Sequence, residues 1–141
     1  MFVRRLLLSL IAALLGVVAL PLLAAPAQAA TEVNSAVAPS GQRGSGPCTE
    51  AIGGAWGCYQ ANGDYWWVYD TRADGHSAVV EWDLPEFGRQ GQCWNRLGSG
   101  HAGVCNKNYP ELYAGGFRVC VRDWTTKEYF GCSEWRQYNT T

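Results

Sequence analysis

Six cysteines constrain the possible folds of this sequence more than any other feature, because the stretch that contains them is short. They fall at spacings of 10, 35, 12, 15 and 12 residues: Cys48, Cys58, Cys93, Cys105, Cys120 and Cys132. None of these spacings is the C-x-x-C of a zinc site or a redox motif, so we expect no metal and no redox chemistry. An even count in a small exported domain predicts a disulfide framework instead.

The N-terminus has the pattern of a secretory signal peptide. A start with Arg4 and Arg5 precedes an apolar run over 6–20, and Pro21 and small residues lead to an A-x-A site at 27–29. This order predicts a signal-peptide helix over 1–29, cleavage before Ala30 and a secreted, extracellular product. Because no cysteine follows the apolar run until Cys48, we expect neither a lipid anchor nor membrane attachment after cleavage.

The mature chain is small and weakly charged. Cleavage removes 29 of the 141 residues and leaves 112, and it takes two of the 11 basic residues, leaving 9 against 12 acidic ones, a net charge of −3. That balance argues against binding to nucleic acid, which requires a clustered basic face. We expect one monomeric unit with a flexible Ala-, Ser-, Gly- and Pro-rich leader over 30–47 and a disulfide-stabilised β domain over 48–141.

The pattern of the domain is typical of antiparallel β structure. Residues 64–70 and 77–83 flank an Asp74-Gly75 turn signal and predict a hairpin. Alternation places one set of side chains on the expected core face: Tyr65, Trp67, Tyr69, Ala78, Val80 and Trp82. The other face, expected to be half exposed, carries Trp66, Val68, Asp70, Val79, Glu81 and Asp83.

A second hairpin is predicted from 116–123 and 128–135, with its turn around Thr126. This register pairs Cys120 with Cys132 and Arg118 with Glu134, and it predicts a Cys120–Cys132 disulfide. Sequence proximity favours Cys48–Cys58 and Cys93–Cys105 for the others. Further strands are expected near 55–60, 90–95 and 112–114, which gives a small antiparallel β-sandwich or open barrel of about six strands.

Aromatic residues are the strongest functional signal. The chain has seven Trp and seven Tyr, and exposed rings beside carboxylates hold sugars by stacking and hydrogen bonding. The leading hypothesis is a secreted, non-enzymatic domain that binds an extracellular glycan or protein and needs no cofactor. Its candidate binding residues are Trp66, Asp70, Glu81 and Asp83.

Two alternatives stay open. Small disulfide-bonded secreted proteins are often protease inhibitors, and the Gly-rich loop 97–103 would then be the reactive element. A small hydrolase would use Glu81 or Asp83 as paired carboxylates. The chain has no G-x-S-x-G nucleophile motif, and we predict no catalytic residue.

A resemblance supports this interpretation of the compartment. The stretches Gly57-Cys58-Tyr59-Gln60, Asp74-Gly75-His76-Ser77-Ala78 and Asn106-Lys107-Asn108-Tyr109 resemble small secreted proteins of high-GC Gram-positive bacteria. The resemblance implies export and β architecture. It implies no catalytic residue.

Overall fold

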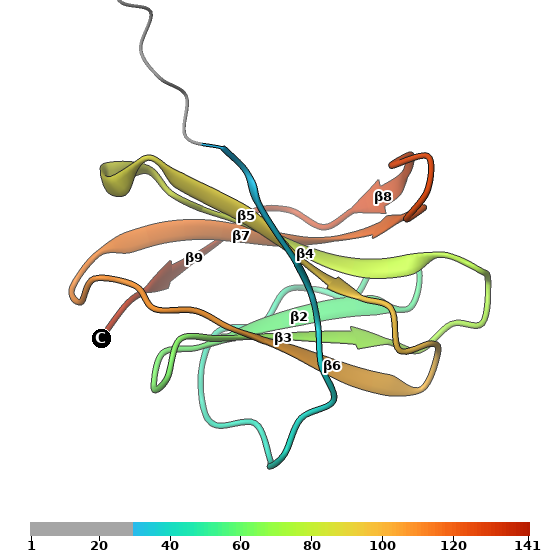
Figure 1. Cartoon of the computed structure of the whole chain (residues 1–141), viewed down its shortest axis with the longest axis horizontal. Coiled ribbons are helices and arrows are strands. Elements are labelled where there is room, and N and C mark those ends of the chain that lie inside the picture. Colours follow the sequence, from blue (N-terminus) through green and yellow to red (C-terminus); the bar gives the residue numbers. More distant parts are fainter. Residues whose placement is uncertain (1–29) are drawn as a thin grey trace, which may run out of the picture.

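Residues 30–141 of the chain are all-β, with nine strands in two packed sheets (Figure 1). This computed structural model describes residues 30–141, so the predicted signal peptide and its cleavage site lie outside the described residues, apart from Ala30. The expected fold class is confirmed as all-β. The number of strands is larger than the expected six, and the larger sheet is mixed rather than purely antiparallel.

The larger sheet has six strands in the order β1-β5-β4-β7-β8, with β9 also paired to β7. Their bounds are β1 (Glu32–Ser35), β4 (Ser77–Leu84), β5 (Arg89–Asn95), β7 (Ala114–Arg122), β8 (Tyr129–Cys132) and β9 (Arg136–Asn139). A short 3₁₀ turn, η1 (Pro85–Phe87), connects β4 to β5. β8 and β9 pair with opposite ends of the long strand β7.

The smaller sheet is antiparallel, with the order β2-β3-β6. Its strands are β2 (Ala55–Gln60), β3 (Tyr65–Asp70) and β6 (His101–Asn106). The two sheets form separate layers in Figure 1, and the core between them takes residues from both.

Large aromatic side chains fill this core. The buried rings are Tyr59, Trp66, Trp82, Tyr109, Phe117 and Tyr138, each at most 4% exposed. Their centroids lie within contact of one another, at 4.7 Å for Tyr59 and Trp66 and 5.2 Å for Trp66 and Phe117. A chain with few large aliphatic residues therefore closes its core with rings, each of which buries a large apolar area.

The predicted first hairpin is wrong. β3 and β4 lie in different sheets, and the segment 71–76 crosses from one layer to the other. The two faces of β3 are consequently the reverse of what was expected. Trp66 and Val68 are buried against β4, while the ring of Tyr65 lies on the outer face. Both faces of β3 carry aromatic residues, so alternation identified the two faces without showing which one is inner.

The predicted leader is also partly wrong, because β1 pairs in parallel with β5. Glu32 accepts hydrogen bonds from Arg89 Nε at 2.8 Å and from Lys107 Nζ at 2.8 Å, which fix the start of the strand. Burial opposes the ionisation of Glu32, but these two cationic partners outweigh it and lower the pKa of the carboxyl. Sequence composition does not show this pairing, since its partners are about 60 to 75 residues away.

All three favoured disulfides are present: Cys48–Cys58, Cys93–Cys105 and Cys120–Cys132. Cys93–Cys105 joins β5 to β6 and so links the two sheets. Disulfides of this number indicate an oxidising compartment. Cys120 pairs with Cys132 across β7 and β8 as predicted, but a register shift follows at Arg122 and the strand pairing does not extend to Glu134.

The remaining strand predictions had mixed outcomes. The strands expected near 55–60 and 90–95 are β2 and β5. The separate strand expected near 112–114 is wrong, because Leu112 lies in a turn and Ala114 is the first residue of β7. β1, β6 and β9 were not predicted. β6 was assigned in part to a Gly-rich loop, because its sequence His-Ala-Gly-Val-Cys-Asn has only one β-branched residue.

Candidate functional site

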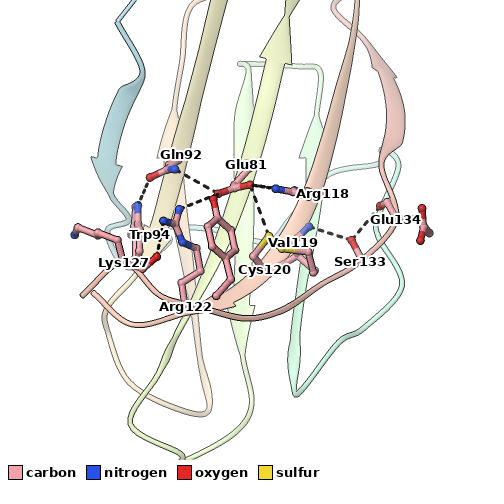
Figure 2. A network of polar contacts seen from close by, with 12 residues as sticks. Glu81, Gln92, Trp94, Arg118, Val119, Cys120, Arg122, Lys127, Ser133 and Glu134 are labelled. Atoms are coloured by element: carbon pink, nitrogen blue, oxygen red, sulfur yellow. Dashed lines mark hydrogen bonds and ion pairs between the residues drawn. A yellow bond between two sulfur atoms is a disulfide. The ribbon is translucent and has the colours of Figure 1, made fainter. Parts of the chain in front are cut away.

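The outer face of the six-stranded sheet holds a carboxylate surrounded by donors. Glu81, in the middle of β4, is only 7% exposed although it lies on the face away from the core. Arg118 donates to its Oε2 from Nε at 3.0 Å and from Nη2 at 2.7 Å. Arg122 donates to its Oε1 from Nη1 at 2.8 Å (Figure 2).

Two neutral side chains complete the shell of Glu81. The Tyr129 hydroxyl donates to Oε1 at 2.7 Å, and Gln92 Nε2 donates to the same oxygen at 3.3 Å. Burial raises the pKa of the Tyr129 hydroxyl, and its hydrogen bond to the charged Glu81 raises it further. The carboxylate therefore serves as an acceptor for residues from β5, β7 and β8, which it fixes relative to one another.

Cations and rings alternate outward from this carboxylate. The guanidinium Cζ of Arg122 lies 3.8 Å from the Tyr129 ring centroid and 5.0 Å from that of Trp94. Arg118 reaches the ring of Trp135 at 5.0 Å. Cation–π contacts of this length contribute about 0.5–2 kcal/mol each, the larger values where water is excluded.

The alternation continues past Trp94 to the end of the sheet. Lys127 Nζ lies 4.7 Å from the Trp94 ring and 3.4 Å from the Trp124 ring, and Arg96 covers Trp124 at 4.1 Å. We call the whole series the cation–aromatic ladder; in order it runs Arg96, Trp124, Lys127, Trp94, Arg122, Tyr129, Arg118 and Trp135. It forms a preorganised surface whose last two rings, Tyr129 and Trp135, are each 48% exposed.

A hollow lies beside this exposed end of the ladder. Its volume is about 260 Å³, and it is lined by Thr31, Glu81, Trp82, Asp83, Gln90, Gly91, Gln92, Tyr129 and Trp135. We call it the β4–β5 hollow. It combines aromatic rings with carboxylate and amide groups, a mixture suited to a polar ligand that also presents apolar faces.

The structure brings two of the four predicted residues together. Glu81 and Asp83 both lie on the outer face of β4 and line the β4–β5 hollow. Asp83 Oδ1 accepts a hydrogen bond from the Gly116 backbone N–H at 2.7 Å, which orients its carboxyl.

Asp70 lies elsewhere, at the end of β3 in the smaller sheet. It lines a cavity of about 480 Å³ between the β3–β4, β5–β6 and β7–β8 connections, together with Arg72, Arg96 and Trp124. Burial raises the pKa of Asp70, and the Arg72 backbone N–H donates to its Oδ1 at 3.1 Å. Asp70 is therefore separate from the β4–β5 hollow.

The interpretation of Trp66 as a half-exposed binding ring is wrong. Trp66 is fully buried between the sheets, and its indole N–H donates to the Tyr109 hydroxyl at 2.7 Å. It packs against five core rings and has no surface to offer a ligand. Its position follows from the placement of β3 in the smaller sheet.

Sequence reasoning missed several residues of this face. A signal for Arg118 and Arg122 was present in the sequence. Both lie two residues from Cys120 along the strand predicted over 116–123, and this spacing places all three side chains on one face. Gln90, Gln92 and the exposed rings Tyr129 and Trp135 carried no comparable signal, because their approach to Glu81 depends on the sheet order.

The proposed reactive loop 97–103 is shorter than expected, since His101–Gly103 belongs to β6. Asn95 closes the remaining turn: its Oδ1 accepts from the Leu97 backbone N–H at 3.0 Å, and its Nδ2 donates to the His101 carbonyl at 2.7 Å. Leu97 is 39% exposed on this turn. The segment is a short turn that carries the chain from β5 in the larger sheet to β6 in the smaller one, rather than an extended loop.

No family model, curated protein or solved structure matches the chain. Within residues 30–141, no helix has the length and apolar character needed to cross a membrane. Over the same residues, no group of three or more His, Cys, Asp or Glu side chains is arranged to hold a metal ion.

Proposed function

We propose that this chain is an exported, non-catalytic binding module that holds an extracellular glycan in the β4–β5 hollow, against the exposed end of the cation–aromatic ladder. Sugar rings present apolar C–H faces and a rim of hydroxyls. A site for them needs a ring to stack on and polar groups that accept and donate hydrogen bonds at its edge.

One observation carries the proposal: two half-exposed rings border a hollow lined by carboxylate and amide groups. Tyr129 and Trp135 supply faces for stacking. Asp83 and Gln90 supply acceptors and a donor for hydroxyls. Tyr and Trp serve well at such positions, because each combines a large apolar face with a polar group.

The rigidity of the face supports binding. Five hydrogen bonds converge on Glu81 from four side chains, and the ladder holds the rings on either side. A surface already ordered in the free protein loses little conformational entropy when a ligand arrives.

The same contacts favour binding over hydrolysis. Both oxygens of Glu81 are engaged by donors from Arg118, Arg122, Gln92 and Tyr129, which leaves no free position for accepting a substrate proton. A general acid or base needs direct access to the reacting group. The role that fits Glu81 is to position its neighbours.

Export is part of the proposal. It rests on the signal-peptide pattern over 1–29, on three disulfides that suit an oxidising compartment, and on the resemblance to small secreted proteins of high-GC Gram-positive bacteria. We propose that the protein acts as a monomer outside the cell.

A glycan-array screen with the mature chain tests the proposal. We expect binding to at least one glycan class and a loss of about tenfold in affinity for Trp135→Ala, equal to about 1.4 kcal/mol. Phe130→Ala is the matched control, since Phe130 is 50% exposed on β8, the strand that precedes Trp135, but stacks on His76 away from the hollow. A chain that binds no glycan, or a protein partner only, would overturn the proposal.

A further inference from the structure

A second row of aromatic rings covers the outer face of the three-stranded sheet. Trp56 and Tyr69 stack across β2 and β3 with centroids 3.6 Å apart and planes within 1°. Trp67 follows at 6.4 Å from Tyr69, with an interplanar angle of 18°. Tyr65 lies at the far end of the same face of β3 and completes the row.

A strap formed by residues 38–47 crosses this face and is fastened at both ends. Val37 and Val104 exchange backbone hydrogen bonds of 3.0 and 2.8 Å at one end, and the Cys48–Cys58 disulfide holds the other. Between them, the Gly44 backbone N–H donates to Gln60 Oε1 at 2.7 Å. The strap is therefore a fixed wall of the surface that it crosses.

A groove of about 190 Å³ lies between the strap and the end of the aromatic row. It is lined by Pro39, Ser40, Gly41, Gln42, Gln60, Tyr65, Trp67 and Val104. All eight residues are uncharged. Because Trp67 Nε1 already donates to Gln60 Oε1 at 3.1 Å, the indole is held in place as the inner wall of the groove.

The lining selects the chemistry of an occupant. A charged ligand would lose its hydration without gaining an opposite charge, which is costly. A purely apolar ligand would leave the hydroxyls of Ser40 and Tyr65 and the amide of Gln42 without partners. A neutral, hydroxyl-bearing ring satisfies both, with a face toward Tyr65 and its hydroxyls toward the strap.

We propose that this groove is a second binding site, for a neutral sugar ring, on the face opposite the β4–β5 hollow. The two sheets pack by their inner faces, so their outer faces point in opposite directions (Figure 1). The inference extends the proposed function but rests on different residues. A chain with both sites is bivalent and cross-links glycans, which raises its avidity without further contacts.

Binding of neutral tetrasaccharides of glucose, mannose, galactose and N-acetylglucosamine to the mature chain tests this site. Ser40→Trp fills the groove from the strap, and Tyr65→Ala removes a wall. Both should weaken the groove's binding by about tenfold or more. Ser45→Trp is the matched control, because Ser45 is also exposed on the strap but does not line the groove. Circular dichroism spectra unchanged from the wild type establish that the variants fold.

The two sites are distinguished by their own variants. Binding that Ser40→Trp and Tyr65→Ala abolish, and that Trp135→Ala leaves unchanged, establishes the groove whatever the hollow binds. Binding that depends on Trp135 alone leaves the proposed function intact and overturns this inference. The absence of binding to all four tetrasaccharides also overturns it. So does a groove that binds a proline-rich peptide but none of the tetrasaccharides.

Discussion

Glu81 and Arg122 form an ion pair that is buried on the outer face of a sheet, with Oε1 and Nη1 2.8 Å apart. Their side chains are only 9% and 7% exposed, because Tyr129 and Trp94 cover the guanidinium. Water is thus excluded from a charge pair on the side of the sheet that faces away from the core. The pair anchors the cation–aromatic ladder.

Breaking this pair should destabilise the fold strongly. Glu81→Gln keeps the volume but leaves the charge of Arg122 buried without a counter-ion. We expect the free energy of unfolding to fall by about 3–5 kcal/mol, measured by urea denaturation. Glu134→Gln, an exposed position near the same face, should change it by less than about 0.5 kcal/mol.

A double variant separates the pair from its surroundings. Combining Glu81→Gln with Arg122→Met removes both charges, so part of the loss should be regained. A Glu81→Gln variant as stable as the wild type would show that Arg122 is not held as described.

Glu32 should make stability depend on pH at the acidic end. Its folded-state pKa lies below the ordinary value of 4.5, so its ionised form stabilises the fold above that value and the contribution disappears as pH falls through the folded pKa. Because the side chain is 33% exposed, we expect Glu32→Gln to cost only about 1 kcal/mol at neutral pH.

Urea unfolding of wild type and Glu32→Gln across pH 7 to 3 measures this effect. The gap between the two proteins should close toward the acid end, whereas exposed Glu86→Gln should show no gap at any pH. A gap that stays constant with pH would mean that the ion pairs of Glu32 with Arg89 and Lys107 do not fix β1.

The packing between the sheets leaves no room for a side chain at Gly57. A Cβ there would lie 2.3 Å from Val80 Cγ2, on the facing strand β4. Gly57→Ala should therefore destabilise the protein by about 1–3 kcal/mol through overpacking. Gly41→Ala, where no atom lies within 4 Å of the added carbon, provides the control; equal stability of the two variants would contradict the sheet packing.

The disulfide between the sheets should matter more than the one on the outer face. Cys93–Cys105 and Cys48–Cys58 close similar sequence separations of 12 and 10 residues, so the chain-entropy contribution is about 3 kcal/mol for each. Replacing Cys93 and Cys105 by Ala also removes buried contacts within the core. Urea denaturation should show a larger decrease in the free energy of unfolding for this double variant than for replacement of Cys48 and Cys58 by Ala. An equal or smaller decrease would contradict the role of Cys93–Cys105 as the link between the two sheets.

Local sequence patterns predicted the strand pairings that are set by residues close together in the sequence. The alternation along 116–123 and the spacing to Cys132 were enough to pair β7 with β8, because a short connection leaves few registers. The same reasoning failed at β3 and β4. There the Asp74-Gly75 turn signal suits a hairpin, but the connection carries the chain from one sheet to the other.

Long-range relations explain the other differences. β1 depends on Arg89 and Lys107, and the shell of Glu81 depends on Tyr129, which is 48 residues away. The sequence could therefore predict that Glu81 and Asp83, both on β4, belong to the candidate binding face. Its exposed rings could not be predicted, since they come from β8 and the segment after it.

Indole N–H signals in a two-dimensional NMR titration test the central claim most directly. The chain has seven Trp residues, and Trp135→Phe assigns the signal of Trp135. Addition of the glycan selected on the array should shift the Trp135 signal and leave that of buried Trp66 unchanged. A glycan that binds without moving the Trp135 signal would contradict the assignment of the β4–β5 hollow as its site.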